Sequence, residues 1–310
     1  MKHTVRNVVS IAALVGLSAS TSFAAFGEIT KSGSTWTGKV DGVTKYTGSS
    51  MTAAANACVA AMSSGTLNIK NSGTLSGAIG IKSNIAVTGN GTTTTSTGTG
   101  GIIRATNASN LSVSNLNMAG TDWFGMYFST CQTMTFSSVN GTSGIAFRID
   151  NCKGGSGSTL QVGSPTISSG GDNGVETYGI NGVKWGTVTA TDRGACGLLL
   201  NQSSSASGTA VNGTRCNTGG GYAGFRVANT NKSTTLGTAT SNNCGRGFFS
   251  VSGSSGCTVS TVNATNCTSH GIWLQTTSNS RVNGGTVKNC HPCTSISSDG
   301  GGNSISVSCQ

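Results

Sequence analysis

A repeat of twenty-odd residues runs along the chain and limits its fold more than any other feature. Each copy contains a Thr-Val-like strand, a corner with Asn, Thr or Asp, then Cys, Gly and a second apolar strand. The clearest copies span residues 188–197, 211–224, 239–247 and 262–271, with looser ones at 116–125, 139–144 and 167–174 and a partial one at 287–290. Such a period is typical of a solenoid, in which each unit stacks on the next.

The strands within each unit are too short to bury a face alone. Residues 224–227 and 271–275 alternate inward and outward positions over only a few residues. Stacking the units about 4.8 Å apart would place each strand beside its counterpart, forming long parallel sheets around an apolar core. The sequence therefore predicts an all-β parallel β-helix, with four residues in register on adjacent coils: Val188, Val211, Ala239 and Val262.

A helix is expected at the start of the solenoid. Residues 49–62 combine a Ser cap, good helix formers and an apolar face. The end of a β-helix exposes unpaired backbone groups, which a helix can cover. We therefore expect residues 49–62 to form a capping helix.

The N-terminal residues predict export. Lys2 and Arg6 precede an apolar stretch over residues 8–17, and small residues follow up to Ala25. This order is typical of a cleavable signal peptide, here residues 1–24, and the stretch is too short to span a bilayer. We expect residues 25–310 to form a single domain that is secreted, extracellular and monomeric, with no membrane partner.

The charge balance favours acidic partners. The chain has 18 basic and eight acidic residues and a formal net charge of +10, although charged residues make up only 8% of it. The basic residues form no Lys/Arg cluster of the kind that binds nucleic acid, so nucleic acid is not expected as a partner. An acidic polymer of another kind fits this balance better.

Eleven cysteines in an exported chain favour disulfides over metal sites, and no zinc-type spacing occurs. Cysteines recur at one position of successive coils, where one or two bonds could join neighbouring coils: Cys216, Cys244, Cys267 and Cys290. Cys131 with Cys152, and Cys293 with Cys309, are further candidate pairs. The connectivity stays open at this stage.

From about residue 49 to the C-terminus, the chain resembles the pectin-lyase-like superfamily. The resemblance rests on the Ala-rich helix, the strand at residues 65–69 and the stacked Asn-Cys-x-x-x-Gly-Ile coils. It implies a right-handed parallel β-helix and a carbohydrate-active protein. The hydrolase and lyase motifs of that superfamily are missing, apart from Asp172-Asn-Gly, a lone Asp192 and Ser269-His270-Gly271. The resemblance therefore indicates a fold and names no reaction.

Aligning the coils on their recurrent Gly separates inward from outward positions. The residues one and three places after the Gly should point inward, as Leu198, Leu200, Phe225, Val227, Ile272 and Leu274 do. The outward column contains Tyr127, Glu176, Leu199, Arg226, Phe249 and Trp273, and a second outward set contains Arg148, Tyr178, Asn201 and Gln275. The outward columns carry the candidate site.

Charge concentrates near the corners of a few coils. The repeat places Asp172 beside Arg193 and Asp192 beside Arg215. Half of the acidic residues and half of the arginines lie within residues 148–226. One interpretation is a set of corner ion pairs that match neighbouring coils. The other is a groove in which arginines bind carboxylates of an acidic polysaccharide while aromatic rings pack on its sugars.

The second interpretation, together with the resemblance, predicts a polysaccharide lyase that acts by β-elimination. This reaction needs a neutralised carboxylate, a base and a proton donor. The candidate catalytic residues are Arg226, Glu176, Tyr178, Asp172, Asp192 and Arg193, and Arg226 is expected to face outward next to Glu176. The candidate substrate-binding residues are Arg148, Arg215, Tyr222, Asn201, Trp273 and His270. No cofactor is expected to be required, and a Ca²⁺ ion, if one bound, would use Asp172, Glu176 and Asp192.

Two other functions stay open. A glycoside hydrolase could use two carboxylates on neighbouring coils as acid and base. A non-catalytic carbohydrate-binding adhesin would need only the binding face. Ice binding is not favoured, because the Thr run at residues 92–99 is not followed by a regular Thr-x-Thr column.

Overall fold

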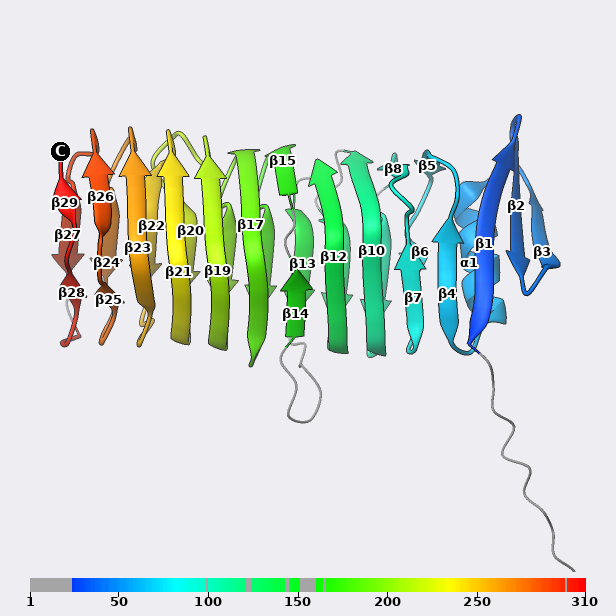
Figure 1. The fold of residues 1–310 in the computed structure, drawn as a ribbon, viewed down its shortest axis with the longest axis horizontal. Helices are drawn as coiled ribbons and strands as arrows, with labels where there is room; N and C mark the ends of the chain where they lie inside the picture. Colours follow the sequence, from blue (N-terminus) through cyan, green and yellow to red (C-terminus); the bar gives the residue numbers. More distant parts are fainter. Residues whose placement is uncertain are drawn as a thin grey trace, which may run out of the picture.

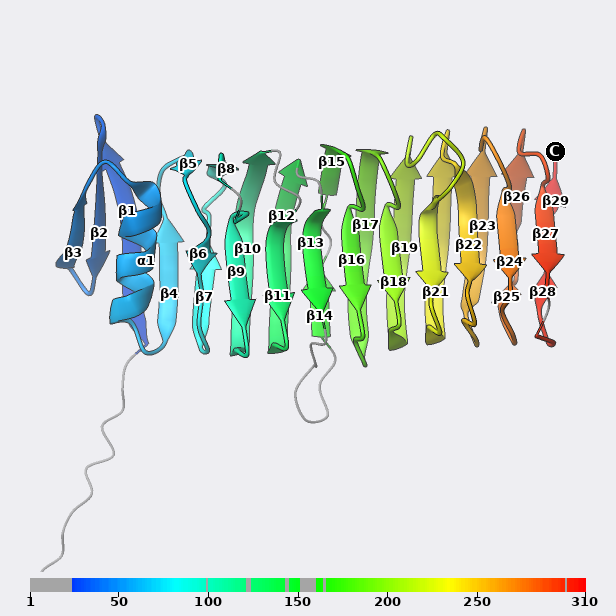
Figure 2. The same cartoon turned by 180° about the vertical axis from the view of Figure 1, so that it is seen from behind.

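The computed structural model describes residues 24–98, 100–120, 124–142, 145–150, 160–163, 166–298 and 300–310. Almost all of the predicted leader lies outside these residues. The described chain forms two long β-sheets wound into a solenoid (Figures 1 and 2).

The larger sheet, sheet A, has 19 strands. They are β1 (Ala25–Ser32), β2 (Thr35–Val40), β3 (Val43–Gly48), β4 (Gly65–Ile69), β5 (Gly73–Leu75), β7 (Ile85–Thr88), β8 (Thr93–Ser96), β10 (Ser109–Gly120), β12 (Gln132–Thr142), β14 (Leu160–Gly163), β15 (Thr166–Gly170), β17 (Val183–Arg193), β19 (Ser204–Thr214), β21 (Lys232–Asn242), β23 (Thr258–Thr265), β25 (Arg281–Val282), β26 (Gly285–Lys288), β28 (Ser304–Ile305) and β29 (Ser308–Cys309).

The second sheet, sheet B, has ten strands that all pair in parallel. They are β6 (Ile79–Gly80), β9 (Ile103–Thr106), β11 (Phe124–Ser129), β13 (Ile145–Asp150), β16 (Val175–Tyr178), β18 (Leu198–Asn201), β20 (Ala223–Ala228), β22 (Arg246–Val251), β24 (Ile272–Gln275) and β27 (Thr294–Ser297). In Figure 1 the strands of sheet A run upward in front, those of sheet B run downward behind, and successive coils advance to the left. This path is right-handed, so the predicted right-handed parallel β-helix is confirmed.

The predicted register is also confirmed. Val188 pairs with Val211, Val211 with Ala239, and Ala239 with Val262, each in parallel strands of sheet A. The predicted inward residues of sheet B are all buried: Leu198, Leu200, Phe225, Val227, Ile272 and Leu274. The apolar core therefore runs between the two sheets along the solenoid.

The predicted helix at residues 49–62 is present as α1 (Met51–Ala61). The Ser50 hydroxyl caps it by accepting a hydrogen bond from the Ala53 amide at 3.1 Å. Its buried face, which includes Cys58 and Val59, covers the first coils, as Figure 2 shows. In the described part of the chain, no helix is long and apolar enough to cross a membrane.

Residues 25–48 form an antiparallel element that the repeat did not predict. Strands β1, β2 and β3 pair in antiparallel fashion, and β1 also joins the solenoid by pairing in parallel with β4. The turn between β2 and β3 consists of Asp41 and Gly42, both with positive φ, at 49° and 77°. An Asp-Gly pair between two strands is a strong hairpin signal, so the sequence did contain this information.

The corner that follows sheet A explains the polar-then-Cys pattern of the repeat. One residue per coil adopts the left-handed conformation there, with φ between 50° and 55°: Asp192, Arg215, Asn243, Asn266 and Asn289. Asn tolerates this conformation better than most residues. The next residue points inward and is buried: Arg193, Cys216, Cys244, Cys267 and Cys290.

The predicted disulfide between Cys293 and Cys309 is present. The expectation of bonds along the cysteine column is wrong, because Cys216, Cys244, Cys267 and Cys290 are buried free thiols. Their sulfurs contact main-chain atoms, such as the Cys267 amide, which lies 3.2 Å from the Cys290 sulfur. The proposed partner of Cys131, Cys152, lies outside the described residues.

Candidate functional site

The outer face of sheet B carries the predicted column of unlike side chains. Glu176, Leu199, Arg226, Phe249 and Trp273 are paired in this order on successive strands. Arg148 pairs with Glu176, so it belongs to this column and not to the second outward set. The second set is in register from Tyr178 to Asn201.

This outer face is partly buried, although it lies outside the main core. A small apolar cluster covers its middle and consists of Cys196, Leu199, Ala223, Ala228, Phe249 and Val251, with Trp273 packed against it. In the column, Arg148 and Glu176 precede this cluster, and Arg226 lies within it, between Leu199 and Phe249. The face therefore has two ends with different chemistry.

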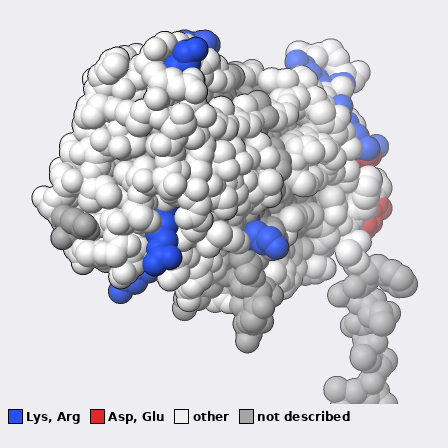
Figure 3. Space-filling view, turned by 60° about the vertical axis from the view of Figure 1, so that its left-hand side comes forward, with Lys and Arg blue, Asp and Glu red and all other residues white. Residues whose placement is uncertain are grey.

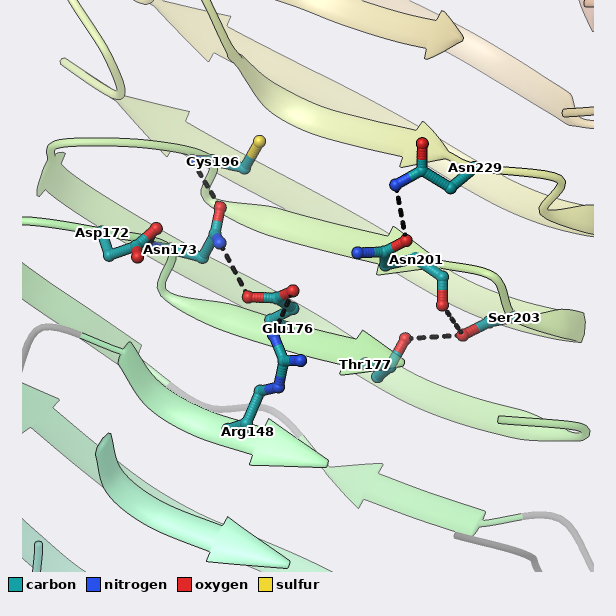
Figure 4. Close-up of polar contacts among 9 residues, drawn as sticks. All are labelled: Arg148, Asp172, Asn173, Glu176, Thr177, Cys196, Asn201, Ser203 and Asn229. Carbon is teal, nitrogen blue, oxygen red and sulfur yellow. Dashed lines mark hydrogen bonds and ion pairs between the residues drawn. The ribbon is translucent and has the colours of Figure 1, made fainter. Parts of the chain in front are cut away.

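The first of these, the acid end, contains Arg148, Asn173 and Glu176, which Figure 4 shows, together with Tyr178. The Glu176 carboxylate is only 5% exposed. Arg148 forms an ion pair with it, and the Asn173 amide donates a hydrogen bond to its other oxygen at 3.0 Å. The Arg148 guanidinium also lies 5.5 Å from the centre of the Tyr178 ring. The ion pair with Arg148 thus balances the negative charge of the Glu176 carboxylate.

Glu176 and Arg226 are not neighbours, contrary to the sequence-based expectation. Leu199 stands between them in the column, so they lie about 10 Å apart along the solenoid. The six candidate catalytic residues therefore do not converge on one point. His270 is farther still, because it precedes the strand of Trp273.

Arg193 supports the corner from the inside. It takes the inward position held by Cys in later coils, is 2% exposed, and its burial lowers its pKa to about 10. Its guanidinium donates hydrogen bonds to the main-chain carbonyls of Asp172, at 3.0 Å, and Asn173, at 2.6 Å. Asp172 and Arg193 are thus neighbours as predicted. However, the residue that pairs with Arg193 in sheet A is Gly170 and not Asp172.

The Asp192–Arg215 pair is an exposed corner ion pair. Arg215 donates from Nε to Oδ1 at 2.5 Å and from Nη2 to Oδ2 at 2.8 Å. The hydrogen bond from Arg215 lowers the pKa of Asp192. The two residues are neighbours as predicted, and the corner ion-pair interpretation describes them well.

The three carboxylates suggested for Ca²⁺ do not fit such a site. Glu176 is bound by Arg148 and by the Asn173 side chain, and Asp192 is bound by Arg215. An Asp172 carboxylate oxygen accepts a hydrogen bond from the main-chain amide of Asn173 at 2.8 Å. No group of three His, Cys, Asp or Glu side chains suited to a metal occurs among the described residues. Calcium binding at Asp172, Glu176 and Asp192 is therefore not supported.

The other end of the face holds a set of side chains that we call the arginine–aromatic cluster: Tyr222, Arg226, Arg246, Phe249, His270 and Trp273. The Arg226 guanidinium lies 4.9 Å from the ring centre of Tyr222 and 5.2 Å from that of Phe249. The Arg246 guanidinium lies 4.4 Å from Phe249 and 4.7 Å from Trp273. These distances permit cation–π attraction, which fixes both guanidinium groups against the rings.

Both arginines lack an acidic partner. Within the part of the chain that the structure describes, neither Arg226 nor Arg246 forms an ion pair. Their Nε atoms are buried and have no hydrogen-bond partner. Elsewhere, Arg148 and Arg215 are each paired with a carboxylate. The cluster therefore holds two positive charges that an anionic ligand could neutralise.

An insertion forms one wall of the cluster. The step from Val211 to Ala239 is 28 residues, whereas the steps on either side are 23 residues. Most of the extra length lies at residues 217–222, where the Tyr222 amide donates to the Asn217 side chain at 2.7 Å. Arg246 donates to the Gly221 carbonyl. Tyr222, 39% exposed, is thereby placed over Arg226. Insertions in repeat proteins often mark the binding face.

His270 and Trp273 complete the cluster. Their rings are stacked with centroids 4.2 Å apart at 7°, and Trp273 stacks on Phe249 at 5.1 Å. Burial, aided by the charge of Arg246, lowers the pKa of His270, so its imidazole is neutral at pH 7. The sequence alignment did not single out Arg246. Its position just before Gly247 placed it outside the outward columns.

Other surfaces of the described chain are weaker candidates for a binding site. A hollow of about 500 Å³ is lined by Gly91 and by uncharged polar residues, which are Asn90, Asn115, Asn117, Ser138 and Asn140. Figure 3 shows a largely uncharged side of the molecule with separate basic side chains and acidic ones only at one edge. The arginine–aromatic cluster therefore remains the strongest candidate for an acidic ligand.

Comparison with known proteins bears on the fold. No protein-family model and no curated protein sequence matches the chain. The fold is similar to the enzymatically active domain of tailspike protein 2 of bacteriophage CBA120, with a TM-score of 0.55 and 15% identity over 82% of this chain and 40% of that chain. Full-length tailspike protein 2 of an Escherichia coli bacteriophage gives a TM-score of 0.51 and 14% identity over 82% of this chain and 36% of that chain.

The catalytic unit of a GH87 alpha-1,3-glucanase from Streptomyces thermodiastaticus aligns at a TM-score of 0.47 and 12% identity, over 82% of this chain and 66% of that chain. The chain spans less than half the length of the tailspike chains it matches. At these identities the tailspike likeness concerns architecture alone. The chain is a parallel β-solenoid similar in fold to the tailspike domain.

Proposed function

We propose that the protein binds an acidic polysaccharide along the outer face of sheet B and cleaves it by β-elimination. One observation carries the proposal: Arg226 and Arg246 lie on aromatic rings and have no acidic partner among the described residues. Arginine held in this way can bind a sugar carboxylate through two hydrogen bonds. Tyr222, which is 39% exposed, supplies a ring surface for a sugar. The predicted export, which we retain as a proposal, would bring the protein to such polymers.

The cluster contains groups suited to each step of the reaction. Arg226 and Arg246 neutralise the carboxylate of a uronic acid, which makes its C5 proton easier to remove. The neutral imidazole of His270 takes that proton, the C4–O bond breaks, and a double bond forms between C4 and C5. The departing oxygen then takes a proton from the Tyr222 hydroxyl. Arg226 is kept as the carboxylate partner, because an arginine stays protonated and makes a poor base.

The hydrolase alternative has weaker support. Hydrolysis needs two carboxyl groups on either side of the scissile bond. Among the described side chains, Glu176 is held by Arg148, and Asp192 is held by Arg215 at a corner. Non-catalytic binding would use the same face and is separated from cleavage by the test.

A screen of acidic polysaccharides tests the proposal. The folded protein is incubated with homopolymeric and mixed polyuronates, and unsaturated ends are followed by near-ultraviolet absorbance. Cleavage should occur and be lost in Arg226→Gln, whereas Arg215→Gln, which removes one arginine at the corner, should leave it intact. Binding should weaken with salt, because the charges are near the surface. Reducing ends without this absorbance would establish hydrolysis, binding without products would establish an adhesin, and no binding would refute the proposal.

A further inference from the structure

Beyond the acid end, toward the first coils, the sheet B face carries a further arginine that lies on an aromatic ring. Arg104 of β9 pairs with Tyr127 of β11, and the Arg104 guanidinium lies 5.7 Å from the centre of the Tyr127 ring. The Arg104 Nε atom donates a hydrogen bond to the Gly100 carbonyl, which fixes the direction of the side chain. Among the described residues, no carboxylate forms an ion pair with Arg104. The arrangement is similar to that of Arg226 on Tyr222.

This arginine belongs to the same outward column as the arginine–aromatic cluster. In the order of strand pairing, the column consists of Arg104, Tyr127, Arg148, Glu176, Leu199 and Arg226. These six residues occupy consecutive coils, so five steps of about 4.8 Å, or about 24 Å in all, separate Arg104 from Arg226 along the solenoid. One straight face therefore carries an arginine on an aromatic ring at each end of this stretch.

The residues between these two arginines attract a carboxylate less. The Arg148 guanidinium is bound to the Glu176 carboxylate, and Leu199 belongs to the outer apolar cluster. Arg104 and both arginines of the arginine–aromatic cluster have no carboxylate partner in the part of the chain that the structure describes. The attraction of an acidic ligand is therefore strongest at the two ends of the stretch.

We infer that Arg104 and Tyr127 form a second subsite for a uronate unit, and that the face recognises an extended stretch of acidic polysaccharide in preference to a short oligosaccharide. The inference rests on the proposed function, from which it takes the ligand. A sugar unit of an extended polysaccharide is about as long as one coil step, so about six units reach from one subsite to the other. Once a polymer is bound at the arginine–aromatic cluster, its binding at Arg104 is intramolecular and adds affinity that a shorter ligand cannot gain.

Uronate oligomers of two lengths test the inference. A trimer is shorter than the distance from Arg104 to Arg226, whereas an octamer is longer. Galacturonate, mannuronate and glucuronate oligomers are titrated by calorimetry into the full chain carrying His270→Gln, which keeps them intact, and the sugar whose octamer binds most tightly is used. The octamer should bind about tenfold more tightly than the trimer. Adding Arg104→Gln should lower the octamer affinity about tenfold and leave the trimer affinity unchanged, because the trimer occupies only the arginine–aromatic cluster.

Further variants make the result specific. Arg281→Gln also removes one positive charge, from an exposed position of β25 in sheet A, and should change neither affinity. Arg226→Gln should weaken the binding of both oligomers. Arg104→Lys keeps the charge but loses the planar pair of N–H groups, so it should give an intermediate octamer affinity, and it replaces Arg104→Gln if that variant folds poorly.

Three results would overturn the inference alone: equal affinities for trimer and octamer, an octamer affinity that does not change when Arg104 is replaced, or an equal loss in Arg281→Gln. No binding of any of these oligomers or of any polyuronate would instead refute the proposed function.

Discussion

Phe248 and Phe249 allow the binding face and the core to be tested with the same substitution. They are consecutive residues of β22, but Phe248 is 0% exposed in the main core and Phe249 lies in the outer cluster beneath both arginines. Phe248 stacks on Phe225 with centroids 5.4 Å apart, and Phe249 stacks on Trp273 at 5.1 Å. Replacing each by Ala removes an equal volume from opposite sides of one strand.

Both substitutions should lower the free energy of unfolding, but only Phe249→Ala should also change the binding affinity. Phe248→Ala should lower the free energy of unfolding by about 3–5 kcal/mol, because it opens a cavity in a packed core. Phe249→Ala should also cost about 3–5 kcal/mol, because Phe249 is 4% exposed in the outer cluster and loses a ring stack and two arginine contacts of about 0.5–1 kcal/mol each. It also frees both guanidinium groups, and ordering them again on binding should cost about 1–2 kcal/mol, or roughly a tenfold loss of affinity.

Urea unfolding gives the stability of each variant. Binding of the folded protein to the acidic polysaccharide for which the wild type has the highest affinity gives the affinity of each variant. Phe249→Ala should weaken binding while Phe248→Ala leaves it close to wild type, although both variants lose stability. The reasoning fails if Phe249→Ala binds like wild type, or if both variants lose affinity equally while fully folded.

The remaining predictions concern pH and thiols. Because burial lowers the pKa of His270, the unfolded chain gains a proton before the folded protein does, so stability should fall as the pH drops below about 6.5. His270→Gln should reduce that slope in urea unfolding between about pH 5 and 8, and an unchanged slope would contradict the assignment. After unfolding without reductant, alkylation and mass spectrometry should find Cys216, Cys244, Cys267 and Cys290 labelled and only Cys293 and Cys309 protected among these six. Protection of the first four would show that bonds do join the coils.

The fold could be predicted because the repeat reports directly on coil geometry. Asn243 and Asn266 mark left-handed corners, and the Cys that follows each of them marks the first inward position. The predicted register was wrong in the coil that contains residues 167–174, where the repeat is less regular. Ile167 pairs with Ala190 and not with Val188, so aligning Ile167 with Val188 shifted that coil by two residues. Apolar spacing alone does not distinguish neighbouring inward positions of one strand.

The site was harder to predict, because contacts between side chains depend on loops and burial. Tyr222 and Arg226 meet because the insertion at residues 217–222 folds back over sheet B, and only its extra length was visible in the sequence. The burial of Glu176 depends on Arg148, whose place in the column follows from strand pairing. Arg246 was missed because it precedes the Gly used for alignment.

The regular spacing of the coils fixes the distances between residues along the outer face of sheet B. Arg226, Phe249 and Trp273 stand on consecutive coils, so the distance between any two features of the face is a whole number of steps of about 4.8 Å. Lengthening or shortening the chain by one 23-residue coil would move features apart or together by one step without changing their local surroundings. A protein built in this way can adapt to a longer or shorter polymer repeat by gaining or losing coils, and its corner and core residues need not change.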